Sequence, residues 1–142
     1  MIRLATPQDA PQLYQLNERF NGPGGAPVEA IAAALAANAQ EVVAVAQVDG
    51  ALAGFACAQV KRSFCYQSPP VEVTEVFVSP ACRRRGLARA MLAFLEDYCA
   101  EKFGASEFTL LTGRRNAPAQ ALYRNAGYTA NDELMMEKGI HL

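Results

Sequence analysis

The sequence has 142 residues, 51% of them hydrophobic, and a net charge of −1. This length and composition exclude a disordered chain and allow a buried core, so we expect one domain over residues 1–142. The near-neutral charge excludes the broad positive field typical of nucleic-acid-binding and membrane-surface proteins, and no apolar run approaches the ~20 residues of a membrane span. We therefore expect a cytoplasmic protein whose partners include neither nucleic acid nor a membrane.

The cysteines and the histidine do not form a metal-binding pattern. Cys57, Cys65, Cys82 and Cys99 are widely separated, no C-x-x-C pair is present, and His141 is the single histidine. Structural zinc sites need closely spaced pairs of such ligands, so we expect no metal site. Cys57 and Cys99 lie within apolar patterns and are predicted to be core thiols.

The first half of the chain predicts a strand, two helices and a hairpin. Thr6 and Pro7 are typical of a helix start, and the spacing of Leu13, Leu16 and Phe20 continues that helix. A loop rich in glycine and proline leads to an alanine-rich second helix, and an Asp-Gly dipeptide between two apolar runs predicts a hairpin. The predicted elements cover residues 2–5, 6–20, 27–39, 41–48 and 51–60.

The second half alternates strands with helices. A valine-rich run predicts a strand, apolar residues at helical spacing predict a long helix, and a short helix follows a buried strand. A final apolar run is predicted to be a last strand. These elements cover residues 71–78, 84–102, 107–112, 116–127 and 133–140. The pattern as a whole predicts a mixed α/β domain.

Three consecutive arginines, Arg83, Arg84 and Arg85, lie where the valine-rich strand gives way to the long helix, and Gly86 follows them. The start of a helix exposes unpaired backbone N–H groups at the positive end of its dipole, and small residues allow an anion to approach them closely. Arginines nearby add charge-assisted hydrogen bonds to phosphate. The stretch predicts a phosphate or pyrophosphate site, and a solvated turn with a packing glycine is the alternative that it leaves open.

The segment VSPACRRRGLA resembles the acetyl-CoA signature of the GNAT N-acetyltransferases, which reads Gln/Arg-x-x-Gly-x-Gly/Ala after a strand ending in Val-x-Pro. The segment NAPAQALYRNAGY is similar to the second signature of that family, Asn-x-x-Ala-x-x-Leu-Tyr-x-x-x-Gly-Phe/Tyr, at every fixed position. The order of the predicted elements is also similar from Met1 to Met136, so the resemblance covers nearly the whole chain. The sequence departs from the family at Arg84, where glycine is frequent.

The resemblance implies a central, mostly antiparallel, twisted sheet flanked by about four helices, with a splayed pair of strands that binds acetyl-CoA as co-substrate. It also implies that a backbone N–H near Phe77 or Val78 meets the thioester oxygen. The residues that the resemblance assigns to cofactor binding are Phe77, Val78, Arg83, Arg84, Arg85, Gly86, Leu87, Ala88, Arg89 and Asn116.

Two residues of the second signature have assigned roles in the family. Tyr123 matches the tyrosine that acts as general acid and protonates the departing thiolate. Its spacing also fits a core tyrosine whose hydroxyl caps a backbone group, and that alternative stays open. Asn116 is predicted to be the N-cap of the short helix, and the resemblance adds a contact with the pantetheine arm.

Glu72 and Glu75 are the candidates for the catalytic base, because each lies in a strand of otherwise apolar residues. Apolar surroundings raise the pKa of a carboxylate, which suits it to accept a proton from an ammonium. Three residues of separation would direct the two side chains to opposite faces of a regular strand, so we expect a bulge between them. Surface glutamates on a sheet edge are the alternative, and Glu75 is the preferred base.

Together these features predict an acetyl-CoA-dependent N-acetyltransferase that acts directly on a primary amine of a small molecule or of a peptide or protein N-terminus. The acceptor is expected at three surface segments, 21–27, the loop of Phe64 and Tyr66, and a final hairpin near 131–133. The sequence contains no strong acidic patch, which weighs against a polycationic acceptor. A non-catalytic acyl-CoA-binding domain and a transferase of longer acyl chains are the alternatives, and the composition is compatible with a homodimer.

Overall fold

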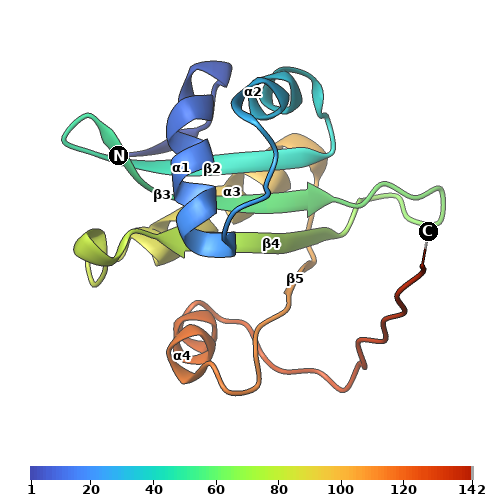
Figure 1. The fold of residues 1–142 in the computed structure, drawn as a ribbon. Helices are drawn as coiled ribbons and strands as arrows, with labels where there is room; N and C mark the ends of the chain where they lie inside the picture. The colour runs from blue at the N-terminus through green and yellow to red at the C-terminus, as the bar shows by residue number, and fades with distance from the viewer. Residues whose placement is uncertain (142) are drawn as a thin grey trace.

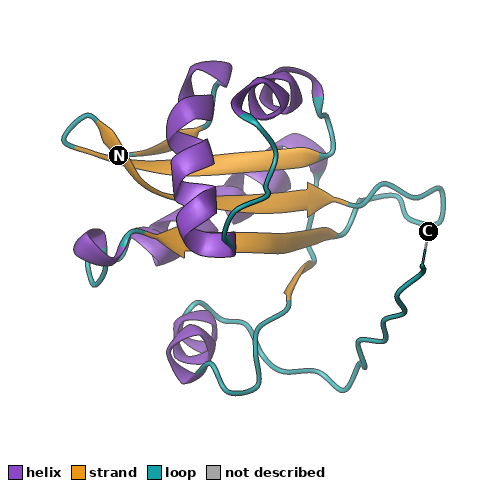
Figure 2. Cartoon of the chain, in the orientation of Figure 1, coloured by secondary structure: helices purple, strands orange, loops and turns teal. Residues whose placement is uncertain are grey.

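The computed structural model describes residues 1–141, and its helices and strands alternate along the chain broadly as the sequence predicts (Figure 1, Figure 2). The elements are β1 (Ile2–Leu4), η1 (Pro7–Asp9), α1 (Ala10–Asn21), α2 (Val28–Ala37), β2 (Glu41–Val48), β3 (Ala51–Val60), β4 (Val71–Val78), η2 (Pro80–Cys82), α3 (Leu87–Phe103), β5 (Phe108–Leu110) and α4 (Ala117–Asn125).

The strands form one five-stranded sheet in the order β1-β2-β3-β4-β5. The first four strands are antiparallel to their neighbours, whereas β5 runs parallel to β4. Asp49 and Gly50 both have positive φ angles, as a tight two-residue hairpin turn requires. The predicted mixed α/β fold with a mostly antiparallel sheet is confirmed.

Helix α3 covers one face of the sheet, on the side away from the viewer in Figure 1. Its residues Met91, Leu95 and Cys99 are fully buried. The strand residues beneath them are small, which lets the helix approach the sheet closely: Ala44, Ala46, Ala56, Ala58 and Val60. This layer fixes the position of the start of α3 relative to the end of β4.

Helices α1 and α2 cover the opposite face (Figure 1). Leu13 and Leu16 of α1 are buried there against Phe55 and Phe77 of the sheet. The ring of Phe20, near the end of α1, stacks on the ring of Phe77 with centroids 5.2 Å apart. The aromatic cluster therefore holds α1 against the second half of β4.

Strand β4 carries the bulge that the sequence predicts. Cys57 of β3 pairs with Glu75 and Ala58 pairs with Val73, so Thr74 has no partner on β3. Strand β5 pairs only with the three residues of β4 that precede the bulge. The two parallel strands consequently separate after the bulge, and the second half of β4 has no neighbouring strand on that side within the described chain.

The predicted last strand, residues 133–140, is wrong: these residues form neither a strand nor a hairpin. The C-terminal segment, residues 129–141, runs in extended form away from α4 and β5 (Figure 1). Its apolar residues remain exposed, among them Leu134 and Met136. The apolar pattern predicted a strand, but the sheet of this chain gives it no partner.

Cys57 and Cys99 are buried free thiols, as the sequence predicts, and burial raises the pKa of both. Within residues 1–141, no three His, Cys, Asp or Glu side chains lie close enough together to hold a metal ion. The described helices include none that is both long and apolar enough to cross a membrane.

Candidate active site

The start of α3 presents a row of backbone N–H groups with no partner in the described chain. Gly86, the N-cap residue, has a left-handed conformation with φ of +74°, and its carbonyl accepts the first helical hydrogen bond, from the N–H of Ala90 at 3.0 Å. No hydrogen bond within residues 1–141 uses the N–H groups from Arg84 to Arg89. These donors, at the positive end of a 17-residue helix, form the cradle that an anion needs.

Two of the arginines shape the loop itself. The Nε of Arg83 donates a hydrogen bond of 2.9 Å to the carbonyl of Val78, and its guanidinium lies 5.9 Å from the ring centroid of Phe77. Arg84 has a φ of 65°, a left-handed conformation that is costly for a residue with a Cβ. The turn therefore has a glycine-like backbone at Arg84, the position at which glycine is frequent in the family.

The free edge of β4 begins at the bulge and leads to this loop. The N–H of Ser79 donates to Ala53 on β3 at 2.7 Å, whereas the carbonyl of Val78 accepts from Arg83 instead. Because backbone groups alternate between the two sides of a strand, the N–H groups of Val76 and Val78 point to the free edge. Of the two amides considered from sequence, that of Val78 faces the open side and that of Phe77 faces β3.

Helix α4 and the chain that follows β5 both lie on the side of the sheet where β4 has its free edge (Figure 1). Asn116 is its N-cap, as predicted, and its Oδ1 accepts a hydrogen bond of 3.2 Å from the N–H of Ala119. The side-chain amide of Gln120 donates to the carbonyls of Gly113 and Arg114, each at 2.8 Å. These bonds hold the loop before α4 in one conformation.

The hydroxyl of Tyr123 has no hydrogen-bond partner within the described residues, so it does not cap a backbone group there. Burial raises the pKa of Tyr123, which keeps the phenol protonated near neutral pH. Its ring packs edge-on against that of Tyr128, with centroids 6.2 Å apart. The hydroxyl of Tyr128 donates to Glu96 of α3 at 2.6 Å and ties the end of α4 to α3.

The bulge directs Glu72 and Glu75 to the same face of the sheet. Glu75 is opposite Cys57 and Glu72 is opposite Gln59, and Cys57 and Gln59 are two residues apart on a regular stretch of β3. Glu72 forms an ion pair with Lys61 at 2.8 Å. Burial raises the pKa of Glu75. A half-buried carboxylate without a salt-bridge partner is the better proton acceptor, which favours Glu75 over Glu72.

Sequence reasoning missed Glu41 of β2, which joins this group of carboxylates. Glu41 is opposite Gln59 and accepts a hydrogen bond of 3.1 Å from its side chain. Burial raises the pKa of Glu41, and the charge of Glu41 contributes to the raised pKa of Glu75. The strand register brings them together across β3, a relation that spacing in a single sequence does not reveal.

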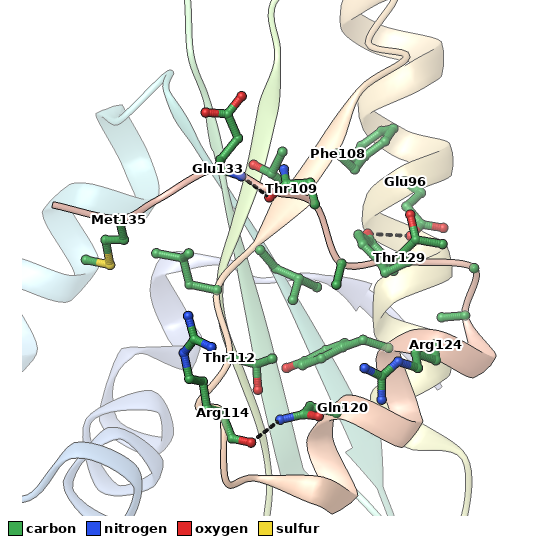
Figure 3. A pocket seen from close by; sticks show the side chains of 18 residues that line it. Glu96, Phe108, Thr109, Thr112, Arg114, Gln120, Arg124, Thr129, Glu133 and Met135 are labelled. Atoms are coloured by element: carbon green, nitrogen blue, oxygen red, sulfur yellow. Dashed lines mark hydrogen bonds between the residues drawn. The ribbon is translucent and has the colours of Figure 1, made fainter.

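The segments expected at the acceptor site, 21–27, the loop of Phe64 and Tyr66 and residues 131–133, do not all border one hollow between β5, α4 and the C-terminal segment. Phe64 and Tyr66 are exposed, and the hairpin expected near 131–133 is absent. A hollow of about 820 Å³ lies between β5, α4 and the C-terminal segment (Figure 3). Tyr123 lines it, but no residue of β4 or of the arginine loop does.

The comparisons with known proteins agree with this geometry. The sequence matches the acetyltransferase (GNAT) family over residues 10–128. It is 28% identical over 94 residues to aminoglycoside N(6')-acetyltransferase type 1 of Salmonella typhimurium, an alignment that spans 64% of this chain and 64% of that protein.

Solved structures share the fold at low sequence identity. An aminoglycoside acetyltransferase from an uncultured soil metagenomic sample, in complex with sisomicin, has a TM-score of 0.85 at 19% identity, over 99% of this chain and 95% of that chain. A ribosomal-protein-alanine N-acetyltransferase from Brucella melitensis biovar Abortus has a TM-score of 0.81 at 22% identity, over 98% and 99%. The names of these two proteins show that one fold serves very different acceptors.

The aminoglycoside acetyltransferase AAC(6')-Iy, in complex with the bisubstrate analogue CoA-S-monomethyl-acetylneamine, has a TM-score of 0.84 at 23% identity, over 99% of this chain and 97% of that chain. The family match covers most of this sequence, including both signature segments and the strand between them. With its splayed strands and the open cradle at the start of α3, this chain belongs to the GNAT acetyltransferase family.

Proposed function

We propose that this protein transfers an acetyl group from acetyl-CoA to a primary amine of a small cationic molecule. The observation that carries the proposal is the row of unpartnered N–H groups from Arg84 to Arg89 beside the free edge of β4. Both features suit acetyl-CoA, because its pyrophosphate is an anion and its pantetheine amides can add to a strand edge. The CoA complexes of AAC(6')-Iy support the same choice of donor.

The residues present fit this donor. Apart from the adjoining residues, no atom of residues 1–141 lies within 4 Å of the position where a Cβ would be added to Gly86, so its backbone is open to a ligand. Arg85 and Arg89 are exposed beside it and can add contacts to phosphate oxygens. The N–H of Val78, on the free edge of β4, is available to stabilise negative charge on the carbonyl oxygen of the acetyl group.

The chemistry removes two protons from the ammonium nitrogen and delivers one to the departing sulfur. The amine attacks as the neutral base, so Glu75 takes the first proton before attack, directly or through water. The second, lost from the nitrogen once the C–N bond has formed, restores the proton that the sulfur receives from Tyr123. The new C–N bond forms as the thioester C–S bond breaks, and the hydroxyl of Tyr123 donates a proton to the departing sulfur. The raised pKa of Glu75 suits a proton acceptor, and the raised pKa of Tyr123 keeps its hydroxyl protonated until the thiolate departs.

The carboxylates of one sheet face support a cationic acceptor. Glu41, Glu72 and Glu75 lie on the face that α1 and α2 cover in part, and all three are half-buried. The sequence contains no linear acidic patch, which weighed against a polycationic acceptor. That argument is weakened here, because strand pairing brings these acidic residues together on one face. The aminoglycoside acetyltransferases among the relatives make aminoglycosides the first compounds to test.

Calorimetric titration with acetyl-CoA, followed by assays of thiol release with a panel of amines, tests the proposal. The panel should contain aminoglycosides such as sisomicin, simple diamines and a short peptide with a free N-terminus. Binding of acetyl-CoA with amine-dependent thiol release and an acetylated product by mass spectrometry is expected. Binding without turnover on any amine would favour the non-catalytic acyl-CoA-binding domain, and no binding would refute the cradle.

Substitution of Tyr123→Phe separates the two remaining interpretations of that residue. The variant should bind acetyl-CoA as the parent does, because the phenol ring and its packing on Tyr128 are retained. Its turnover should fall by about 10²- to 10⁴-fold, the usual contribution of a positioned general acid. Parental turnover in this variant would leave Tyr123 as a packing residue.

A further inference from the structure

Helix α4, which carries Tyr123, is held in place by little packing. None of its residues is buried, and the strand before it, β5, has only three residues. A hollow of about 820 Å³ lies between α4, β5 and the C-terminal segment (Figure 3). Burial of an apolar face is what usually fixes a helix against a sheet, so α4 depends on other contacts for its position.

One hydrogen bond joins the last part of the chain to the helix α3. The hydroxyl of Tyr128, which follows α4, donates to Oε2 of Glu96 at 2.6 Å (Figure 3). The other hydrogen bonds described for residues 113–141 are made among those residues, and neither of the two ion pairs within residues 1–141 includes one of them. An O–H···O⁻ bond of this length is charge-assisted and roughly twice as strong as a neutral one.

Tyr128 connects this hydrogen bond to Tyr123 through two contacts. The N–H of Tyr128 donates to the carbonyl of Tyr123 at 2.9 Å, and the two rings pack edge-on with centroids 6.2 Å apart. Burial, together with the bond to Glu96, raises the pKa of Tyr128, so its hydroxyl remains a donor. Tyr123 is therefore held by a residue that is itself held by α3.

Glu96 is well placed to serve as a fixed point. It follows Leu95, which is fully buried in the layer between α3 and the sheet. The start of the same helix forms the anion cradle at Gly86. One rigid helix thus sets the positions of both the cradle and, through Glu96, the ring of Tyr123.

We propose that Glu96 is a positioning residue for acetyl transfer: by accepting the hydrogen bond from Tyr128, it holds Tyr123 where the hydroxyl of Tyr123 can protonate the departing sulfur. This inference rests on the proposed function, because it concerns the general acid of that reaction. Glu96 transfers no proton itself and acts only through Tyr128. A displacement of about 1 Å at a reacting group can lower a rate about 10²-fold, so loss of this bond should be visible in turnover.

Substitution of Tyr128→Phe removes the hydroxyl and retains the ring that packs on Tyr123. The variant should lower kcat for the acetylated amine by about 10- to 10²-fold, and its Kd for acetyl-CoA, measured by calorimetric titration, should equal that of the parent because the cradle is unchanged. Glu96→Ala should show the same loss. Glu96→Gln should recover most of the lost turnover, because the amide oxygen of glutamine can still accept the hydrogen bond.

Tyr98→Phe is the matched control on the same helix. It removes a phenol hydroxyl that accepts a hydrogen bond of 3.1 Å from Lys102, near the other end of α3. This bond joins two residues of α3 and does not involve α4, so kcat should equal that of the parent. Parental kcat in Tyr128→Phe or in Glu96→Ala overturns the proposal.

A double-mutant cycle separates positioning of Tyr123 from a general structural effect. In the Tyr123→Phe background, Tyr128→Phe should lower kcat no further, because the hydroxyl that Tyr128 helps to position is already absent. Losses that multiply independently would mean that Tyr128 acts by another route, which overturns the proposal while turnover of the parent upholds the proposed function.

Hydrogen–deuterium exchange tests the structural step without reliance on turnover. The amides of residues 119–125 should exchange faster in Tyr128→Phe than in the parent, whereas those of residues 91–99 in α3 should be unchanged. Equal exchange in α4 overturns the proposal even if no amine is acetylated. A parent with no turnover on any amine refutes the proposed function, and with it the role of Glu96 in that reaction.

Discussion

Substitution of Gly86→Ala tests the anion cradle at the start of α3. Gly86 has a φ of +74°, and apart from the adjoining residues no described atom lies within 4 Å of the position of an added Cβ. An alanine there adds no clash in the free protein, but it puts a methyl group on the backbone that an anion would approach. The left-handed conformation itself should cost about 1–2 kcal/mol of folding stability.

Gly104, the C-cap residue of the same helix, provides a matched control. Its φ is +70°, and the nearest atom to an added Cβ is the hydroxyl oxygen of Ser68 at 3.8 Å, an ordinary contact. Gly104→Ala should therefore lose a similar 1–2 kcal/mol, estimated from the same conformational cost. Urea denaturation measures the loss of folding stability in both variants. Because this conformational cost is the same for both, any remaining difference in acetyl-CoA binding comes from the cradle.

Calorimetric titration with acetyl-CoA then isolates the effect on the cradle. Gly86→Ala should weaken binding at least about tenfold, equivalent to about 1.4 kcal/mol, whereas Gly104→Ala should bind as the parent does. Titration with dephospho-CoA, which retains the pyrophosphate, should show the same loss in Gly86→Ala. Equal affinities of the two variants at equal stability would refute the cradle and leave Gly86 as a turn residue.

Three further predictions concern the carboxylates and the arginine loop. Glu75→Gln should lower kcat about 10²-fold or more. It should also abolish an acidic limb of the pH profile, which lies above the ordinary glutamate pKa of about 4.3 because burial raises the pKa of Glu75. Glu72→Gln loses only an ion pair with a lysine, so its kcat should stay within a few-fold of the parent value. Arg84→Gly should be more stable than Arg84→Ala by about 1 kcal/mol in urea denaturation, because only glycine relieves the conformational cost of a φ of 65°. Equal stabilities of the two variants would contradict that backbone conformation. The hydrogen bonds from Arg3 lower the pKa of Asp9, so Asp9→Asn should cost about 2 kcal/mol of folding stability at pH 7. This difference in stability should disappear as the pH falls below about 3.9 and through the lowered pKa. A difference that persists in acid would refute this origin.

The sequence predicted the elements of the fold wherever the signal was local. The hairpin at Asp49, the N-cap at Asn116 and the bulge in the valine-rich strand each depend on a few adjacent residues. The last strand was wrong for a different reason, since strand formation needs a partner that an apolar pattern cannot supply. Residues 133–140 satisfy the pattern and find no such partner in the described chain.

The candidate site was predictable to the extent that it depends on backbone. A helix start with small residues can be recognised in the sequence, because the property that matters at Gly86 is the absence of a side chain. The carboxylate group was not predictable, since Glu41 meets Glu75 only through the register of three strands. The choice of Glu75 over Glu72 as the base could not be made from sequence either. It depends on the ion pair between Glu72 and Lys61, which forms only in the folded chain.

The single extra residue at Thr74 links the two halves of the proposed chemistry. Without it, Glu72 and Glu75 would lie on opposite faces of β4, and only one of them could face the half-buried carboxylate of Glu41. The same insertion coincides with the end of pairing between β4 and β5, so the free backbone edge begins where the strand changes phase. Under the proposed function, the strand edge that binds the donor and the carboxylate that acts on the acceptor both depend on this one local irregularity.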